Sequence, residues 1–192
     1  MFTESYKRNR KGSSNAIILH LDGDKKYAKR ALNYYNNLNL KAIVENIQEK
    51  NQSNEITLLL ETYRPNILVI TGHDKMYKKG QDLYKIENYK NSKYFMEVVK
   101  KAREWEKSEE KLIIFAGACE SFYEALMIAG ANFASSPARI MIEYRDPLII
   151  ASKIAMENER KNITMKDLKP YLRSNYNGIG GKCAKGQKKD WQ

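Results

Sequence analysis

Short apolar runs alternate along the chain with longer stretches in which apolar residues recur at helical spacing. Nearly continuous apolar runs cover residues 16–21, 67–70 and 112–115, which is typical of strands buried on both faces of a sheet. A shorter run at 42–44 and the segment 139–143 predict two further strands.

The stretches between these runs predict helices, because their apolar residues fall on one face of a 3.6-residue period. The predicted helices cover residues 25–37, 55–63, 93–106, 121–129, 148–156 and 165–172. Pro65 ends the second helix, Ser92 is expected to cap the third, and Thr164 to cap the last. The remaining segments are predicted to be irregular: a polar loop at 46–54, a long lysine-rich loop at 74–91, and a turn at 130–137.

Strand and helix alternate throughout, which predicts a mostly parallel central sheet covered on both faces. The expected fold is therefore a three-layer α/β/α sandwich. Residues 16–175 are expected to form this domain, preceded by a flexible basic leader at 1–15 and followed by a loose Gly/Lys-rich tail at 176–192.

Composition narrows the class of protein. The 192 residues carry a net charge of +11, but the lysines are scattered over predicted helix faces, so we expect a solvated surface and not a nucleic-acid partner. No apolar run approaches the roughly 20 residues that span a bilayer, and no membrane partner is expected. Since the chain has only Cys119 and Cys183, we expect neither a disulfide framework nor a cysteine-based metal site. No cofactor is expected. The low cysteine content favours a reducing, cytoplasmic setting.

Candidate chemistry lies at the ends of the predicted core strands, where parallel sheets place their sites. His73 follows the strand at 67–70, and Cys119 lies at a strand-to-helix turn. A helix N-terminus stabilises a thiolate, so we expect Cys119 to be a nucleophile and His73 its general base and acid. The backbone N–H of Cys119, with one from Gly72 to Asp74, would bind the oxyanion.

Either residue alone would more often be a buried structural side chain, and it is the pair at strand ends that favours catalysis. His20 lies inside a predicted strand, where a core or supporting role is expected. Cys183 lies in the expected loose tail and is predicted to be non-catalytic.

Carboxylates at the same edge suggest a substrate. Asp22, Asp24, Glu120 and Asp146 would surround the thiol, which disfavours its ionised form unless a cation binds among them. A substrate arginine or lysine would supply that cation. Two alternatives stay open: Asp22 and Asp24 could ligate a metal, or Asp24 could cap the following helix.

The turn at 130–137 contains two further hydroxyl groups. Ser135 and Ser136 are most simply part of that turn, although their hydroxyls could also line a pocket.

Five segments together resemble the YabG family of sporulation-specific cysteine proteases. They are residues 20–24, 68–74, 91–95, 115–119 and 129–137, and the resemblance extends over roughly 16–181. The run at 129–137 is a specific signal, and the five segments together are hard to reach by chance.

The resemblance implies processing of spore coat and cortex-associated proteins in the mother cell, with cleavage near arginine through a thioester acyl-enzyme. It places His73 and Cys119 at the family's catalytic positions. The strand ends are also similar to the caspase–gingipain–clostripain superfamily, in which the first and last core strands shape the S1 pocket. That similarity implies that Asp22 or Asp24, together with Asp146, binds arginine. Spore proteins would be the partners, and the oligomeric state stays undetermined.

The chain departs from these patterns at several positions. Asp74 replaces the glycine that usually follows the superfamily's histidine, Glu120 replaces an expected glutamine, and Lys182 replaces an expected acid. Family members also carry a further N-terminal region, so we expect a divergent or shortened member whose activity could be impaired. The alternatives are a catalytically weak binding or scaffold protein of the spore coat and, on net charge alone, a nucleic-acid-binding protein.

Overall fold

A six-stranded sheet forms the centre of the protein in a computed structural model that describes residues 14–77, 82–174 and 177–189. Its strand order is β2-β1-β3-β4-β5-β7, and only β7 is antiparallel to its neighbour. The strands are β1 (Ile17–Asp22), β2 (Lys41–Asn46), β3 (Ile67–Thr71), β4 (Ile113–Ala116), β5 (Phe133–Ser135) and β7 (Ile179–Gly181). A second, two-stranded sheet pairs β6 (Asn162–Thr164) with β8 (Cys183–Lys185).

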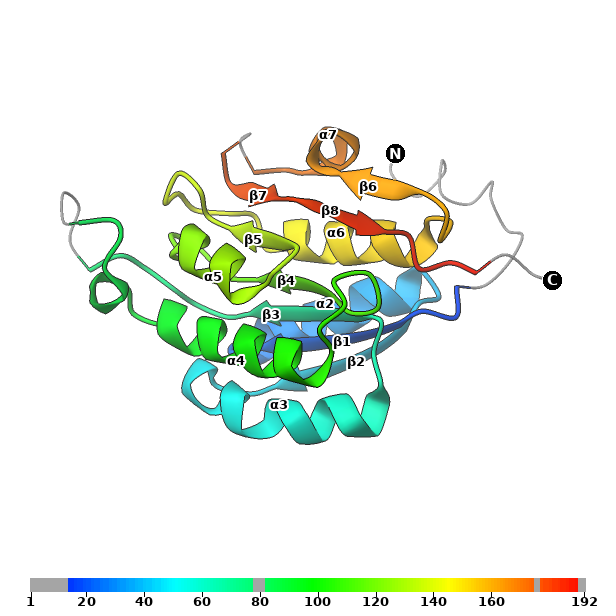
Figure 1. The fold of residues 1–192 in the computed structure, drawn as a ribbon, viewed down its shortest axis with the longest axis horizontal. Coiled ribbons are helices and arrows are strands. Elements are labelled where there is room, and N and C mark those ends of the chain that lie inside the picture. Colours follow the sequence, from blue (N-terminus) through cyan, green and yellow to red (C-terminus); the bar gives the residue numbers. More distant parts are fainter. Residues whose placement is uncertain (1–13, 78–81, 175–176, 190–192) are drawn as a thin grey trace.

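Helices cover both faces of the sheet. They are α2 (Lys25–Asn37), α3 (Glu49–Tyr63), α4 (Ser92–Trp105), α5 (Tyr123–Ala129), α6 (Arg145–Met156) and the short α7 (Met165–Leu168), with 3₁₀ turns η1 (Ile86–Asn88) and η2 (Lys169–Tyr171). Figure 1 shows α3, α4 and α5 on the near face, and α2 and α6 behind the sheet. The predicted three-layer sandwich with a mostly parallel sheet is confirmed.

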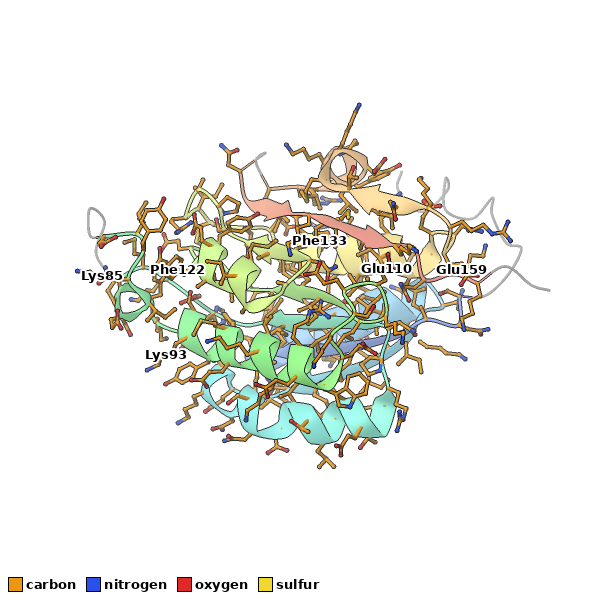
Figure 2. All side chains as sticks on the ribbon, viewed as in Figure 1. Lys85, Lys93, Glu110, Phe122, Phe133 and Glu159 are labelled. Carbon is orange, nitrogen blue, oxygen red and sulfur yellow. The ribbon has the colours of Figure 1, made fainter. Side chains whose placement is uncertain are left out.

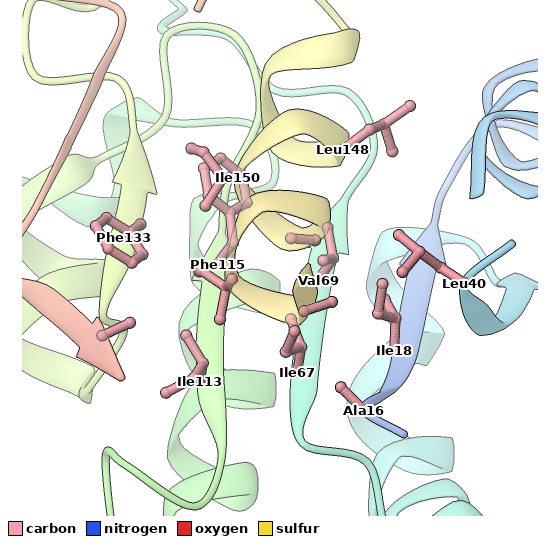
Figure 3. Packing of buried hydrophobic residues seen from close by; sticks show 14 of the residues in the cluster. Ala16, Ile18, Leu40, Ile67, Val69, Ile113, Phe115, Phe133, Leu148 and Ile150 are labelled. Atoms are coloured by element: carbon pink, nitrogen blue, oxygen red, sulfur yellow. The ribbon is translucent and has the colours of Figure 1, made fainter. Parts of the chain in front are cut away.

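The segments 67–70 of β3 and 113–116 of β4 are apolar at every position because successive side chains enter opposite layers. Val69 and Phe115 pack in the layer of α2 and α6 (Figure 3), whereas Leu68 and Ile114 pack against α3 and α4. Burial of each such side chain contributes about 1.5–3 kcal/mol, so the two layers hold the sheet from both sides.

The predicted polar loop at 46–54 was wrong, because α3 already begins at Glu49. The side chain of Gln52 is fully buried, and its Nε2 donates to the carbonyl oxygens of Ile47 and Thr71. Tertiary hydrogen bonds thus place a polar sequence in a helix.

The predicted strand at 139–143 was also wrong. These residues form no strand, and Met141 among them is 73% exposed. The fifth parallel strand is instead β5, which lies inside the predicted turn at 130–137 and pairs with β4. A three-residue strand depends on its neighbour for stability, and its own sequence gives little signal.

The expected loose tail is ordered over residues 177–189, where it supplies β7 and β8. Gly181 is required there, since a Cβ would lie 2.3 Å from the ring of Phe133, the buried β5 residue labelled in Figure 2. Apart from Ser14 and Asn15, the predicted leader lies outside the described residues. Across the described ranges, no helix has the length and apolar character needed to cross a membrane.

Replacing Leu68 by Ala should lower the free energy of unfolding by about 2–5 kcal/mol, because it leaves a cavity between β3 and the helices over it. Leu58→Ala is the matched control, since Leu58 is 62% exposed on α3 and should change stability by less than about 0.5 kcal/mol. Urea denaturation of both variants measures this. Equal losses would contradict the described packing.

Candidate active site

The two predicted catalytic residues follow neighbouring strands at matching positions. Ile70 of β3 and Ala116 of β4 are register partners, and His73 and Cys119 each lie three residues beyond them. Adjacent parallel strands are about 4.8 Å apart, so both side chains belong to the carboxyl edge of the sheet. At the left of Figure 1 the chain leaves β3 at this edge and runs toward α4.

His73 is held by a carboxylate from a third strand end. Its Nε2 lies 2.9 Å from Oδ2 of Asp24, and its side chain is 58% exposed. A carboxylate only accepts hydrogen bonds, so Nε2 carries a proton, and in the neutral ring the lone pair is then on Nδ1. The hydrogen bond from His73 lowers the pKa of Asp24, with further lowering from two backbone N–H groups and against the effect of burial.

Asp24 has a second role as the N-cap of α2. Its Oδ1 accepts from the backbone N–H groups of Lys26 and Tyr27. The capping alternative is thus confirmed, and the cap fixes the carboxylate that contacts His73.

Glu49 holds the backbone beside His73, and sequence reasoning missed it because it lies in the predicted loop at 46–54. Its Oε1 accepts from the His73 N–H at 2.7 Å. The carboxylate occupies the space above Gly23 and Gly72, where a Cβ would lie 2.2 and 2.4 Å from Oε1. Small residues at both positions therefore admit the Glu49 side chain to the strand ends.

Cys119 lies half-buried in a tightly bonded loop. Its Sγ is 3.5 Å from the backbone N of Ile142, which donates to it, and 3.9 Å from the Ile142 carbonyl oxygen. On the preceding residue, the Ala118 N–H donates to Ser121 Oγ and the carbonyl accepts from Ser135 Oγ. The loop before the thiol is thereby fixed on both sides.

Asp74 joins the histidine segment to the cysteine loop. It is 7% exposed, and its Oδ2 accepts from the hydroxyls of Ser92 and Ser121. Its Oδ1 accepts from the backbone N–H groups of Lys75 and Asn91. Burial raises the pKa of Asp74, and these hydrogen bonds oppose the rise.

Ser92 does not cap α4, so that prediction was wrong. The helix begins at Ser92 itself, and Asn91 precedes it without a side-chain capping bond. The Ser92 hydroxyl donates to Asp74 and accepts from the Phe122 N–H at 2.8 Å. It therefore connects the start of α4 to the start of α5.

Two of the predicted acids have carboxylates engaged inside the protein. Asp22 is buried and accepts from Thr71 Oγ1 and from the Asp24 N–H, both at 2.8 Å. Asp146 is fully buried and accepts from the backbone N–H groups of Arg173 and Ser174. The expected position of Asp146 after a strand was wrong, because it lies in the first turn of α6.

The other predicted residues lie around the cysteine loop. Ser135 and Ser136 are buried, and the Ser136 hydroxyl bonds both backbone groups of Ile140. Glu120 is half-buried, has a left-handed backbone (φ 55°), and accepts from the Met76 N–H through Oε2. Of the predicted acids, Asp24 thus contacts His73, whereas Asp146 is buried in the first turn of α6.

The metal alternative for Asp22 and Asp24 gains no support from the geometry. Over the ranges that the structure describes, no group of three or more His, Cys, Asp or Glu side chains is arranged to hold a metal ion.

Comparison with known proteins shows the family of the chain. The YabG peptidase U57 family matches residues 2–191 of the chain. The chain belongs to the YabG peptidase family. It is 41% identical over 164 residues to the sporulation-specific protease YabG of Bacillus subtilis strain 168, which covers 85% of this chain and 57% of that protein. The chain therefore spans less than two thirds of that relative's length.

His20 supports the strand ends from inside the sheet, as expected for a residue within a strand. Its Nδ1 lies 3.1 Å from the hydroxyl of Tyr35 and its Nε2 lies 2.7 Å from Thr71 Oγ1. Burial raises the pKa of Tyr35 well above its usual range, so its hydroxyl stays a donor. Thr71 in turn donates to Asp22, which accepts from the Asp24 N–H. Buried hydrogen bonds therefore connect Tyr35 to Asp24.

Asp24 contacts His73 in space and Asp74 follows it in sequence. The contributions of these two carboxylates to folding stability should change with pH in opposite directions. The pKa of Asp74 is higher in the folded protein than the value of about 3.9 in the unfolded chain. Its protonated carboxyl therefore stabilises the fold at pH below about 3.9, and this stabilisation is lost as pH rises through the folded pKa. The unfolding free energy of the wild type relative to Asp74→Asn should therefore fall as pH rises above about 3.9.

Asp24→Asn is the control with the opposite sign. The pKa of Asp24 is lowered, so the wild type should gain stability relative to this variant as pH rises. Denaturant titrations at each pH measure both differences. A difference for Asp74→Asn that does not change with pH would contradict the raised pKa.

Proposed function

We propose that this chain is a cysteine endopeptidase in which Cys119 is the nucleophile and His73 the general base and acid. The observation that carries the proposal is the matched placement of both residues, three positions beyond register partners on adjacent strands. Membership in a peptidase family supports it.

In the proposed reaction, Nδ1 of His73 takes the proton of the Cys119 thiol while Asp24 holds the ring through Nε2–H. The sulfur attacks the peptide carbonyl carbon and forms an S–C bond. When the C–N bond breaks, His73 returns its proton to the leaving amine. Water, deprotonated by His73, then hydrolyses the thioester and releases the thiol.

The negative oxygen formed in both steps needs backbone donors. In the described part of the chain, the N–H groups of Cys119 and Asp74 have no acceptor, whereas that of His73 donates to Glu49. We assign the oxyanion to the amides of Cys119 and Asp74, and Gly72 would serve by allowing the backbone to turn there.

The proposed substrates are spore coat and cortex-associated proteins cleaved near arginine in the mother cell, as the family resemblance implies. Because the carboxylates of Asp22 and Asp146 are engaged inside the protein, the arginine preference is assigned to Glu120. Glu120 follows the nucleophile directly and is partly exposed. Asp24, which is 30% exposed, is assigned instead to orienting His73.

Removing the orienting carboxylate should slow the chemistry without weakening substrate binding. Asp24→Asn should lower kcat by about 10- to 1,000-fold with KM little changed, and Cys119→Ala and His73→Ala should abolish cleavage. Asp167→Asn is the matched control, since Asp167 is also a helix-capping carboxylate with a lowered pKa but lies on α7. Steady-state hydrolysis of a fluorogenic peptide measures all four.

Cleavage that persists in Cys119→Ala would overturn the assignment of the nucleophile. An equal fall of kcat in Asp24→Asn and Asp167→Asn would mean that Asp24 acts only through helix stability. If the wild type cleaves nothing, the scaffold alternative becomes the better description.

The arginine preference should depend on charge beside the thiol. In a peptide-library digest, Glu120→Gln should lower cleavage after arginine relative to neutral residues by about tenfold, because one carboxylate partner of the guanidinium is lost. Glu97→Gln, an exposed change on α4, is the control and should keep the preference. Wild-type cleavage after another residue would retain the Cys119/His73 pair and discard the arginine pocket.

A further inference from the structure

A cationic hollow of about 400 Å³ lies between α2, the start of α6 and the segment after η2. Within the described residues, its lining includes three arginines and no acidic side chain. The lining residues that matter are Arg30, Asn33, Tyr144, Arg145, Tyr171 and Arg173. A concave surface of this composition is suited to an anionic group.

Aromatic rings hold the guanidinium groups of this hollow. The guanidinium carbon of Arg30 lies 5.6 Å from the ring centroid of Tyr27 and 5.3 Å from that of Tyr144. The guanidinium of Arg145 lies 5.4 Å from the Tyr144 ring and uses Nε to bond Glu143. Stacking orders a planar guanidinium through its faces and leaves its N–H edges to hydrogen-bond a ligand, although in Arg145 the Nε edge already bonds Glu143.

The hollow is connected to the candidate active site by ring contacts. The Tyr27 ring lies 6.0 Å from the His73 ring and 5.4 Å from the Tyr144 ring, measured between centroids. Tyr144 also follows Ile142, whose backbone contacts the Cys119 sulfur, by two residues. The Tyr27 ring therefore lies between His73 and Arg30, so a peptide substrate bound at His73 could extend past this one ring to the hollow.

We propose that this hollow is a substrate subsite that binds an aspartate or glutamate side chain near the scissile bond. The proposal rests on the proposed peptidase function and adds a requirement to it: an acidic residue in the cleaved segment. Guanidinium groups bind carboxylates through paired hydrogen bonds, and the volume is near the lower end for small-ligand sites. A nucleic acid would instead need a basic surface with several phosphate contacts along it.

Binding should be measured without turnover, on the Cys119→Ala protein, by fluorescence anisotropy. Two labelled peptides are compared, identical except that Asp and Glu in one are Asn and Gln in the other. The acidic peptide should bind about tenfold more tightly at low salt, with a smaller difference at high salt. Arg30→Glu in the same protein should remove the difference.

Lys29→Glu is the matched control. Lys29 precedes Arg30 on α2, is exposed, and does not line the hollow, so the same charge reversal there should keep the preference. Arg30→Gln, a milder change, should also reduce the preference and guards against misfolding of Arg30→Glu. Circular dichroism melting checks that each variant is folded.

Equal affinities for the two peptides, or a preference that Arg30→Glu and Lys29→Glu reduce alike, would overturn the proposal. So would a single-stranded DNA oligonucleotide that binds more tightly than the acidic peptide and loses affinity in Arg30→Glu, because the hollow would then be a nucleic-acid site. Failure of the peptidase proposal is read separately, from wild-type cleavage of both peptides, since the binding assay needs no nucleophile.

Discussion

One buried carboxylate, that of Asp74, holds together the two loops on which the candidate site depends. Burial of a charge is costly unless hydrogen bonds compensate it. Here two backbone N–H groups and the hydroxyls of Ser92 and Ser121 surround the carboxylate, and burial still raises its pKa. Because Ser121 also bonds the Ala118 N–H, the position of the thiol follows from the position of the residue next to His73.

A second set of hydrogen bonds fixes the histidine from the other side of the sheet. It passes from Tyr35 through His20 and Thr71 to Asp22, whose carboxylate receives the Asp24 N–H. Tyr35, His20, Thr71 and Asp22 are buried, whereas Asp24 is partly exposed and contacts His73. Networks of this kind rigidify a site when every member is satisfied.

The sequence was sufficient for the layer architecture and for the strand-end positions of His73 and Cys119, because apolar runs and helical periods are local signals. It was insufficient for β5 and β7, which are three residues each and owe their conformation to pairing and to the contact of Gly181 with Phe133. The contact of His73 with Asp24 and the reach of Glu49 depend on side-chain directions, which spacing along the chain does not specify.

The antiparallel strand β7 has a consequence for biosynthesis. Its first residue, Ile179, pairs with Ser135 of β5 from 44 residues later in the chain (179 − 135), so one edge of the sheet stays unpaired until residues 179–181 leave the ribosome. Ser135 on β5 holds the carbonyl of Ala118 beside the thiol. A nascent chain that still lacks these residues therefore has an incompletely supported cysteine loop, and maturation of the site is delayed until the edge strand is in place.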